Sequence, residues 1–418
     1  MERTAHDCFL GARTLRNGCL LEVMETVERP FETFAGRDSP RGSRRIAAGF
    51  ALALGGIVCA ALALEIGLRL CGYRVPILLT DKARETYRIA PQSRFVYFGY
   101  LPGEVEDFHN PVELNAEGFH DHDYGTERPT PSTYRILVLG DSYVAALEVP
   151  LEQTFHKRLE DRLTREDPLG RGSYQVIAIG QGRTAQETEI EWLRRYGPRY
   201  EPDLVLLLFF CGNDFMENDP EIFAEASAFG TRYITKVAPR KIRLYHELLL
   251  FPHSRLNGLA AEAAAEYYAE HLDRFDPSVG RADIESPELG LYRNPLPAPW
   301  QRAFDRTAKL LEVARRETEK LHARFVLASL SGPQGIGEFA ERALWARARD
   351  PGFDYGRPDR WVDEWAERAH VPLLALGPPL AAIGRDKVFW KHDQHLNPAG
   401  HAAVAERLYP FLVDLAKH

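Results

Sequence analysis

A regular alternation of short apolar runs with amphipathic segments constrains the fold of this chain more than any other feature of its sequence. Three runs rich in Ile, Val and Leu, at 134–140, 174–180 and 203–210, are too short for buried helices and predict strands. Between them, residues 152–166 and 184–197 have the apolar spacing of amphipathic helices. Further along, the pattern predicts a helix at 300–321, a strand at 324–331, a helix near 359–369, a strand at 371–376 and a helix at 398–416. Strands that are apolar on both faces and alternate with helices predict an α/β fold, in which a parallel sheet is covered by helices on both sides.

A single long apolar span lies near the N-terminus. Residues 46–64 are 19 consecutive residues without a charged or strongly polar side chain, which nearly covers a hydrocarbon core of ~30 Å as a helix. We expect a transmembrane anchor at 46–68, preceded by a cytoplasmic or disordered tail at 1–45. Five Lys and Arg residues lie in the 20 positions before the span and four in the 20 after it, which favours a cytoplasmic N-terminus and an extracytoplasmic C-terminal body. A cleaved signal peptide is the alternative, because Ala61-Leu62-Ala63 has a small-x-small pattern.

Charge, hydropathy and cysteine content exclude several classes of protein. With 52 Lys and Arg against 60 Asp and Glu, the net charge is −8 and no basic cluster is present, which argues against a nucleic-acid partner. A mean hydropathy of −0.32 and one apolar span exclude a polytopic membrane protein. None of the five cysteines forms a CxxC pair, so zinc-ribbon and thioredoxin-type proteins lack support.

Four polar motifs follow predicted strands. They are Gly140-Asp141-Ser142, Gly180-Gln181-Gly182, Gly212-Asn213-Asp214 and, near the C-terminus, Asp393-Gln394-His395. Each one alone is typical of a turn or a helix cap. The carboxyl ends of parallel strands meet at one edge of a sheet, where ligand sites form, so the motifs are expected to lie together.

These residue types supply every part of an acyl-transfer site. Ser142 is the candidate nucleophile, His395 the general base that takes its proton, and Asp393 the carboxylate that orients the imidazole. The backbone N–H groups of Ser142 and Gly182 and the side-chain amide of Asn213 are the candidate oxyanion donors.

In order and spacing, the four motifs resemble the signature blocks of the SGNH (GDSL) hydrolase family. The segments 114–124 and 146–160 also resemble the flanks found in its membrane-anchored bacterial members. The resemblance covers about residues 85–214 and 300–418. It implies a flavodoxin-like sheet and a serine esterase or acyltransferase without a metal or other cofactor. It also implies the Ser142, His395 and Asp393 triad and an oxyanion hole from Ser142, Gly182 and Asn213.

The motifs depart from the family pattern at three places. Tyr143 follows the serine where the family nickname has leucine. The short second motif leaves open which glycine faces the oxyanion, and Gly182 is favoured over Gly180. The family acid lies two or three residues before the histidine, and Asp393 fits the first spacing while the second position holds His392, so Asp393 is the better acid.

The expected body is one SGNH hydrolase-like domain over residues 73–418, with an insertion at about 215–299 that contains an Ala-rich helix at 258–272. The α/β-hydrolase fold is excluded because no G-x-S-x-G surrounds Ser142.

Histidines and aspartates at 120–123 and around His395 could suggest a metal site, but no H-E-x-x-H is present and 120–123 is interpreted as a solvated loop. For five aromatic residues, core packing is preferred over a sugar-stacking surface: Phe95, Tyr97, Phe98, Tyr100 and Trp390.

The sequence thus predicts a membrane-anchored serine esterase acting on short acyl esters, such as O-acetyl groups, on carbohydrate or lipid of the cell envelope. Two alternatives remain open: an O-acyltransferase that uses the same triad on an envelope polysaccharide, and a non-catalytic SGNH-like binding module. The complete set of Ser, Gly, Asn, Asp and His argues against the binding module.

Overall fold

The computed structural model describes residues 40–71, 78–81, 86–89, 91–99, 108–226, 256, 287–332, 352–390 and 395–417. Several predictions therefore fall outside the described residues. These are the tail up to residue 39, the helix at 258–272 with most of the predicted insertion, and Tyr100, His392 and Asp393.

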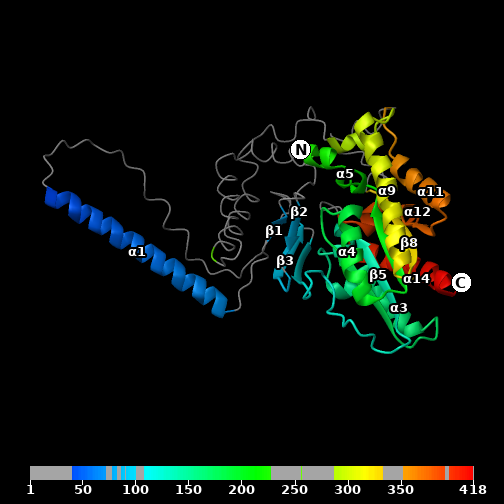
Figure 1. Cartoon of the computed structure of the whole chain (residues 1–418), viewed down its shortest axis with the longest axis horizontal. Helices are drawn as coiled ribbons and strands as arrows, with labels where there is room; N and C mark the ends of the chain where they lie inside the picture. The colour runs from blue at the N-terminus through cyan, green and yellow to red at the C-terminus, as the bar shows by residue number, and fades with distance from the viewer. Residues whose placement is uncertain are drawn as a thin grey trace.

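The centre of the fold is a parallel sheet, marked in Figure 1 by the labels β5 and β8. The sheet has five strands in the order β6-β5-β7-β8-β9. Its strands are β5 (Tyr134–Gly140), β6 (Tyr174–Gly180), β7 (Leu204–Phe210), β8 (Arg324–Leu330) and β9 (Leu373–Ala375). In chain order the strands run 2-1-3-4-5, which is the flavodoxin-like arrangement. The predicted fold class is confirmed. The register sets Gly140 opposite Gly180, so these two strands end side by side.

Successive strand residues point to opposite sides of the sheet. Because the residues on both sides are apolar, helices cover both faces. In β5, Leu137 and Leu139 belong to one apolar core and Ile136 and Val138 to the other. The first core packs against α4 (Gln186–Tyr200), α9 (Ala298–Lys320) and α11 (Arg357–Ala369), and the second against α3 (Phe155–Glu166), α12 (Gly377–Ile383) and α14 (Pro398–Lys417). Shorter elements connect these layers: α2 (Ser142–Ala145), η1 (Leu151–Gln153), α5 (Asp214–Glu217), η3 (Pro287–Tyr292) and α13 (Arg385–Val388).

Two small antiparallel hairpins precede the sheet. β1 (Leu78–Asp81) pairs with β2 (Thr86–Ile89), and β3 (Arg94–Gly99) pairs with β4 (Phe108–Glu113). The second hairpin contributes Tyr97 and Phe108 to a small apolar cluster with Trp390, whose ring centroid lies 5.4 Å from that of Phe108. Tyr97 and Trp390 are therefore packing residues, as the sequence analysis preferred.

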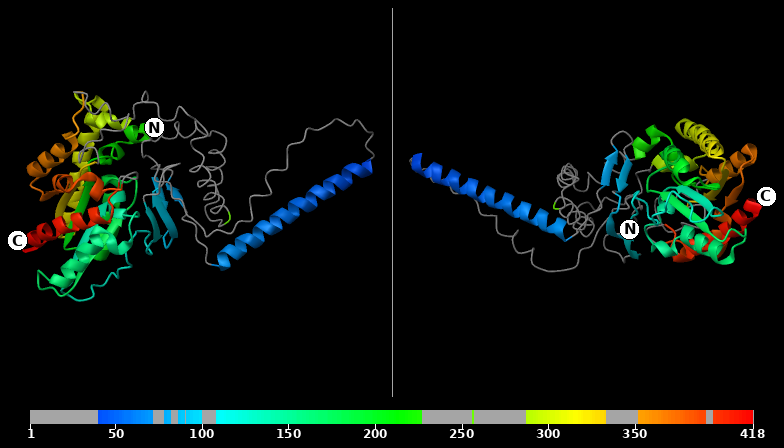
Figure 2. Two further views of the ribbon diagram at one scale, coloured as in Figure 1. Left: turned by 180° about the vertical axis from the view of Figure 1, so that it is seen from behind. Right: turned by 60° about the horizontal axis from the view of Figure 1, so that its bottom comes forward.

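The predicted anchor at 46–68 falls inside the long helix α1 (Pro40–Leu70). Its span Ala48–Leu70 has a mean hydropathy of 2.2, is long and apolar enough to cross a membrane, and has none of its residues buried in the protein. Figure 2 shows α1 extending away from the sheet and its helices. Among the side chains whose exposure the structure describes, Ile383 is the one large exposed hydrophobic outside this helix.

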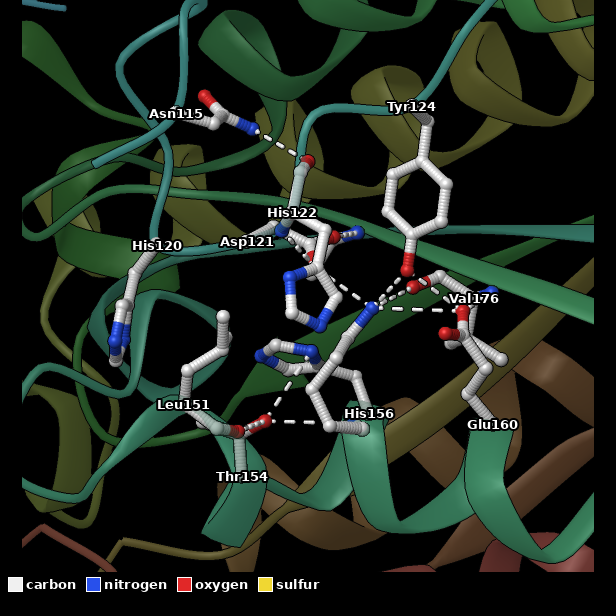
Figure 3. Close-up of polar contacts among 12 residues, drawn as sticks. Asn115, His120, Asp121, His122, Tyr124, Leu151, Thr154, His156, Glu160 and Val176 are labelled. Carbon is white, nitrogen blue, oxygen red and sulfur yellow. Dashed lines mark hydrogen bonds and ion pairs between the residues drawn. The ribbon is translucent and has the colours of Figure 1, made fainter. Parts of the chain in front are cut away.

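Only half of residues 120–123 is the solvated loop that the sequence analysis expected: His122 and Asp123 are exposed, but His120 and Asp121 are not. The side chains of His120 and Asp121 are buried, and Asp121 Oδ1 lies 2.6 Å from Nζ of the buried Lys157 (Figure 3). Asp121 Oδ2 accepts a hydrogen bond of 2.7 Å from the N–H of Ala178, and Lys157 Nζ donates to the carbonyl of Val176. These two backbone groups belong to β6, the edge strand, so the charged side chains satisfy hydrogen-bonding groups that no further strand covers.

Candidate active site

The nucleophile candidate lies on a short helix that packs directly on the ends of two strands. A Cβ atom on Gly140 would lie 2.4 Å from Cγ2 of Val144, and one on Gly180 would lie 2.7 Å from the backbone nitrogen of Ala145. Glycine is required at both positions because α2 approaches the strands too closely for a side chain. Gly180 is therefore a packing residue, and its Cα faces α2.

Asp141 closes the turn between β5 and α2. Its carboxylate accepts a hydrogen bond of 2.9 Å from the N–H of Tyr143, which makes it the N-cap of α2. The side chain is fully buried, and this burial raises the pKa of Asp141 to about 6. The cap holds Ser142 at the first position of α2, where it remains partly exposed.

The structure brings the predicted nucleophile and base together. His395 Nε2 lies 2.9 Å from Ser142 Oγ, within hydrogen-bonding distance. His395 is held against the residues that follow α13, because the N–H of Trp390 donates to the carbonyl of His395 and Phe389 pairs with Leu396 in a β-bridge.

Tyr143, the departure from the family leucine, supports the imidazole. Its ring centroid lies 4.9 Å from that of His395 and 4.4 Å from that of Phe210. The tyrosine ring therefore fills the space between the end of β7 and the candidate base. The sequence analysis did not assign this role, because it depends on a contact between residues from three distant segments.

Gly182 lies beside the nucleophile. A Cβ on Gly182 would be 3.8 Å from the Cβ of Ser142, with no closer neighbour. This geometry separates the two glycines of the second motif: Gly180 packs on α2, whereas the partly exposed Gly182 borders the serine side chain. A carbonyl approaching Ser142 Oγ meets no side chain at Gly182.

Asn213 follows β7, the strand next to β5 in the sheet. Its Nδ2 donates to Glu217 Oε1 at 3.2 Å. The amide also helps to lower the pKa of Asp141 against the larger effect of burial, which places it next to the residue before the nucleophile.

A buried polar network fixes the backbone that carries Asn213. Asp214 Oδ2 accepts hydrogen bonds from the N–H of Phe210 and from Gln186 Nε2, at 3.0 and 2.8 Å. Asn218 Nδ2 donates to Gln186 and to Thr307 Oγ1. Burial raises the pKa of Asp214 well above its usual range. The sequence analysis did not identify this network, although Asp214 is part of the third motif.

The predicted acid and the metal-site alternative concern residues beyond the nucleophile–base pair. Asp393, the predicted acid, lies outside the described residues. His401, which lies within the helix predicted at 398–416, is buried in the first turn of α14. Within the described part of the chain, no group of three His, Cys, Asp or Glu side chains could hold a metal ion.

Comparison with known proteins gives one family match. The model of the "GDSL-like Lipase/Acylhydrolase family" matches residues 138–403, which include all four motifs. No curated protein matches the chain.

Solved structures of esterases are similar to part of this chain. The acetyl xylan esterase AlAXEase is 14% identical, with a TM-score of 0.36, over 66% of this chain and 98% of that chain. The psychrotrophic esterase EstA from Pseudoalteromonas sp. is 12% identical, with a TM-score of 0.36, over 68% and 99% of the two chains. A catalytic mutant of Axe2, an acetylxylan esterase from Geobacillus stearothermophilus, is 11% identical, with a TM-score of 0.37, over 67% and 94%.

Proposed function

This chain belongs to the GDSL-like lipase/acylhydrolase family, and on that premise we propose that it is a serine esterase that hydrolyses short acyl esters of the cell envelope. The observation that carries the proposal is the distance of 2.9 Å between Ser142 Oγ and His395 Nε2. A serine and an imidazole at this distance form a nucleophile–base pair, and Gly182 leaves room for an ester carbonyl beside them.

The reaction proceeds through an acyl-enzyme. His395 Nε2 takes the proton of Ser142 Oγ as the oxygen attacks the ester carbonyl, and a tetrahedral intermediate forms. His395 then gives that proton to the departing alcohol, which leaves the acyl group on Ser142. A water molecule, deprotonated by His395, attacks the acyl carbonyl, and the return of the proton to Ser142 Oγ releases the carboxylic acid.

Charge on the tetrahedral oxygen is stabilised by the N–H groups of Ser142 and Gly182 and by the Asn213 amide. The hydrogen bond from that amide to Glu217 holds the Asn213 side chain in place beside the end of β7. Asp393 is proposed to accept the Nδ1 proton of His395, which fixes the tautomer in which Nε2 is free to act as the base.

The substrate class follows from the placement of the enzyme. We propose that α1 anchors the chain in a membrane and that the sheet domain faces the extracytoplasmic side. The apolar surface of α1 supports the membrane anchor. The excess of arginine before the span supports the orientation. An enzyme held there meets acyl esters of envelope polysaccharide and lipid, and O-acetyl groups on carbohydrate are the proposed substrate.

The test uses the full chain in detergent micelles. Turnover of p-nitrophenyl acetate is measured for the wild type and for Ser142→Ala and His395→Ala, with thermal unfolding as the control for folding. We expect turnover by the wild type and loss in both variants at an unchanged unfolding temperature. Activity retained in either variant would refute the nucleophile–base pair.

The same samples separate the alternatives. An O-acyltransferase would acylate Ser142, detected by mass spectrometry, but release the acyl group only when a polysaccharide acceptor is added. A binding module would neither turn over the ester nor acquire an acyl group on Ser142.

A further inference from the structure

A second pair of side chains joins the two chain segments that carry Ser142 and His395. His401 Nε2 lies 3.2 Å from Glu148 Oε1, and the exposed fractions of the two side chains are 0% and 2%. Glu148 follows Ser142 by six residues and His401 follows His395 by six, so both pairs span 253 residues of the chain. The buried pair therefore joins the same two chain segments as the candidate catalytic pair, six residues further along each segment.

The hydrogen bonds of His401 define its tautomer. The backbone N–H of Phe155 donates to His401 Nδ1 at 3.2 Å, so Nδ1 carries no proton and Nε2–H donates to the Glu148 carboxylate. The imidazole also stacks on the ring of Phe155, with an interplanar angle of 8°. His401 thus connects α14 to the start of α3 and to the segment that follows the nucleophile helix.

The segment that leaves α2 is held on both sides of Glu148. The carbonyls of Ala145 and Ala146 lie 3.1 and 3.2 Å from His120 Nδ1. The carbonyls of Leu147 and Val149 accept hydrogen bonds of 2.8 and 2.7 Å from Asn110 Nδ2. The position of Glu148 is therefore fixed relative to Ser142 by contacts that do not involve His395.

The segment between His395 and His401 has equally little freedom. Asn397 Oδ1 accepts hydrogen bonds from the N–H groups of Ala399 and Gly400, both at 3.0 Å, and so begins α14. A Cβ on Gly400 would lie 2.0 Å from the carbonyl oxygen of Val388, so the helix start lies directly against the preceding turn. A change in the position of His401 is therefore transmitted to His395.

From this geometry we propose that Glu148 and His401 are positioning residues for the Ser142–His395 pair. The inference rests on the proposed function. Neither residue touches the reacting atoms. Their hydrogen bond sets the separation of the two segments, and a displacement of about 1 Å between nucleophile and base is enough to reduce the rate by about 10²-fold.

The test compares two substitutions of Glu148 in the full chain. Glu148→Gln keeps an oxygen acceptor for the Nε2–H of His401, whereas Glu148→Met has a similar volume and no acceptor. The control is Arg135→Met, because Arg135 is also fully buried but lies at the opposite end of β5, where it donates to the carbonyls of Thr126 and Tyr200. The readouts are kcat and KM for p-nitrophenyl acetate and the rate at which a small fluorophosphonate modifies Ser142, all measured well below each unfolding temperature.

We expect Glu148→Met to lower kcat by roughly 10- to 100-fold with KM changed by less than about two-fold, and to slow the modification of Ser142 by the same factor. Glu148→Gln should restore most of both rates. Arg135→Met should lower the unfolding temperature and leave kcat and the Ser142 reactivity near wild type.

Two outcomes overturn the inference alone: wild-type kcat and Ser142 reactivity in a folded Glu148→Met, or an equal loss of kcat in Arg135→Met. If Glu148→Met does not fold, His401→Asn replaces it, because its amide oxygen can still accept from Phe155 N–H while its side chain is too short to reach Glu148. A wild-type chain that neither turns over the ester nor reacts at Ser142 would instead overturn the proposed function, and the inference with it.

Discussion

His395 Nε2 lies 2.9 Å from Ser142 Oγ although 253 residues separate the two positions in the chain. The contact joins the end of β5, the first strand of the sheet in chain order, to the turn that precedes the last helix, α14. α14 packs on the same apolar core as α3 and on the same face of the sheet. The alignment of the pair therefore depends on how α14 docks, and not on the local structure of either motif.

Loss of the Asn213 amide should weaken catalysis without weakening the fold. We expect Asn213→Ala to lower kcat by roughly 10²–10³, the effect of removing one oxyanion donor. Steady-state kinetics measures the change, and thermal unfolding confirms that the variant is folded. An unchanged kcat would remove Asn213 from the oxyanion hole.

The two glycines of the second motif should respond differently to alanine. In Gly180→Ala the new methyl group would lie 2.6 Å from Val144 Cβ, so α2 must move, and we expect a loss of about 1–3 kcal/mol in the free energy of unfolding. In Gly182→Ala the nearest atom is 3.8 Å away, so stability should hold while kcat falls, because the methyl group borders the oxyanion position. Denaturant unfolding and kinetics on both variants check this, and the reverse pattern would exchange the roles of the two glycines.

Asp393→Asn should impair the base without removing it. If Asp393 holds the Nδ1 proton of His395, the amide would favour the wrong tautomer, and kcat should fall by about 10³–10⁴. His392→Ala serves as the neighbouring control and should retain most of the wild-type kcat. Equal losses in the two variants would argue against Asp393 as the acid of the triad.

The ionisation of Asp141 should make stability depend on pH. Burial raises its pKa from 3.8 in the ordinary case to about 6, so between those values the folded chain holds a proton that the unfolded chain has lost. The contribution of this Asp141 proton to the free energy of unfolding is complete below pH 3.8 and is lost as pH rises through about 6. At about 1.4 kcal/mol per pKa unit, the effect amounts to about 3 kcal/mol.

Asp141→Asn isolates this effect, because asparagine also caps helices and can accept from the N–H of Tyr143. Relative to wild type, the variant should become more stable as the pH is raised from about 4 to about 8, by up to about 3 kcal/mol. Urea unfolding of both proteins across this range provides the measurement. A difference that does not change with pH would show that Asp141 does not titrate there.

Removal of one partner from the buried pair Asp121–Lys157 should destabilise the fold strongly. Lys157→Met leaves the Asp121 carboxylate buried without its cation, and we expect the free energy of unfolding to fall by about 3–5 kcal/mol. The double variant Lys157→Met with Asp121→Asn should recover part of this loss, since no buried charge is then unpaired. A Lys157→Met variant as stable as the wild type would show that Asp121 does not depend on Lys157 as its buried partner.

Local sequence patterns predicted the elements of the sheet domain closely, and small differences have physical causes. The strand predicted at 203–210 begins at Leu204, because Asp203 uses its carboxylate to accept from the N–H of Arg135 at 2.7 Å. The helix predicted at 152–166 begins at Phe155, because Thr154 is its N-cap.

The sequence by itself determined the succession of strands and helices and the fold class, because apolar periodicity is a local property of the chain. Ser142 and His395 were predicted as partners from the chemistry of their motifs and the resemblance to the SGNH family. Only the tertiary structure decided which buried polar side chains meet. The contact of Tyr143 with His395 and the pairs Asp121–Lys157 and Glu148–His401 are of this kind. A buried charge or imidazole must find its partner across the packed layers, and residue spacing along the chain carries no record of which distant group will be there.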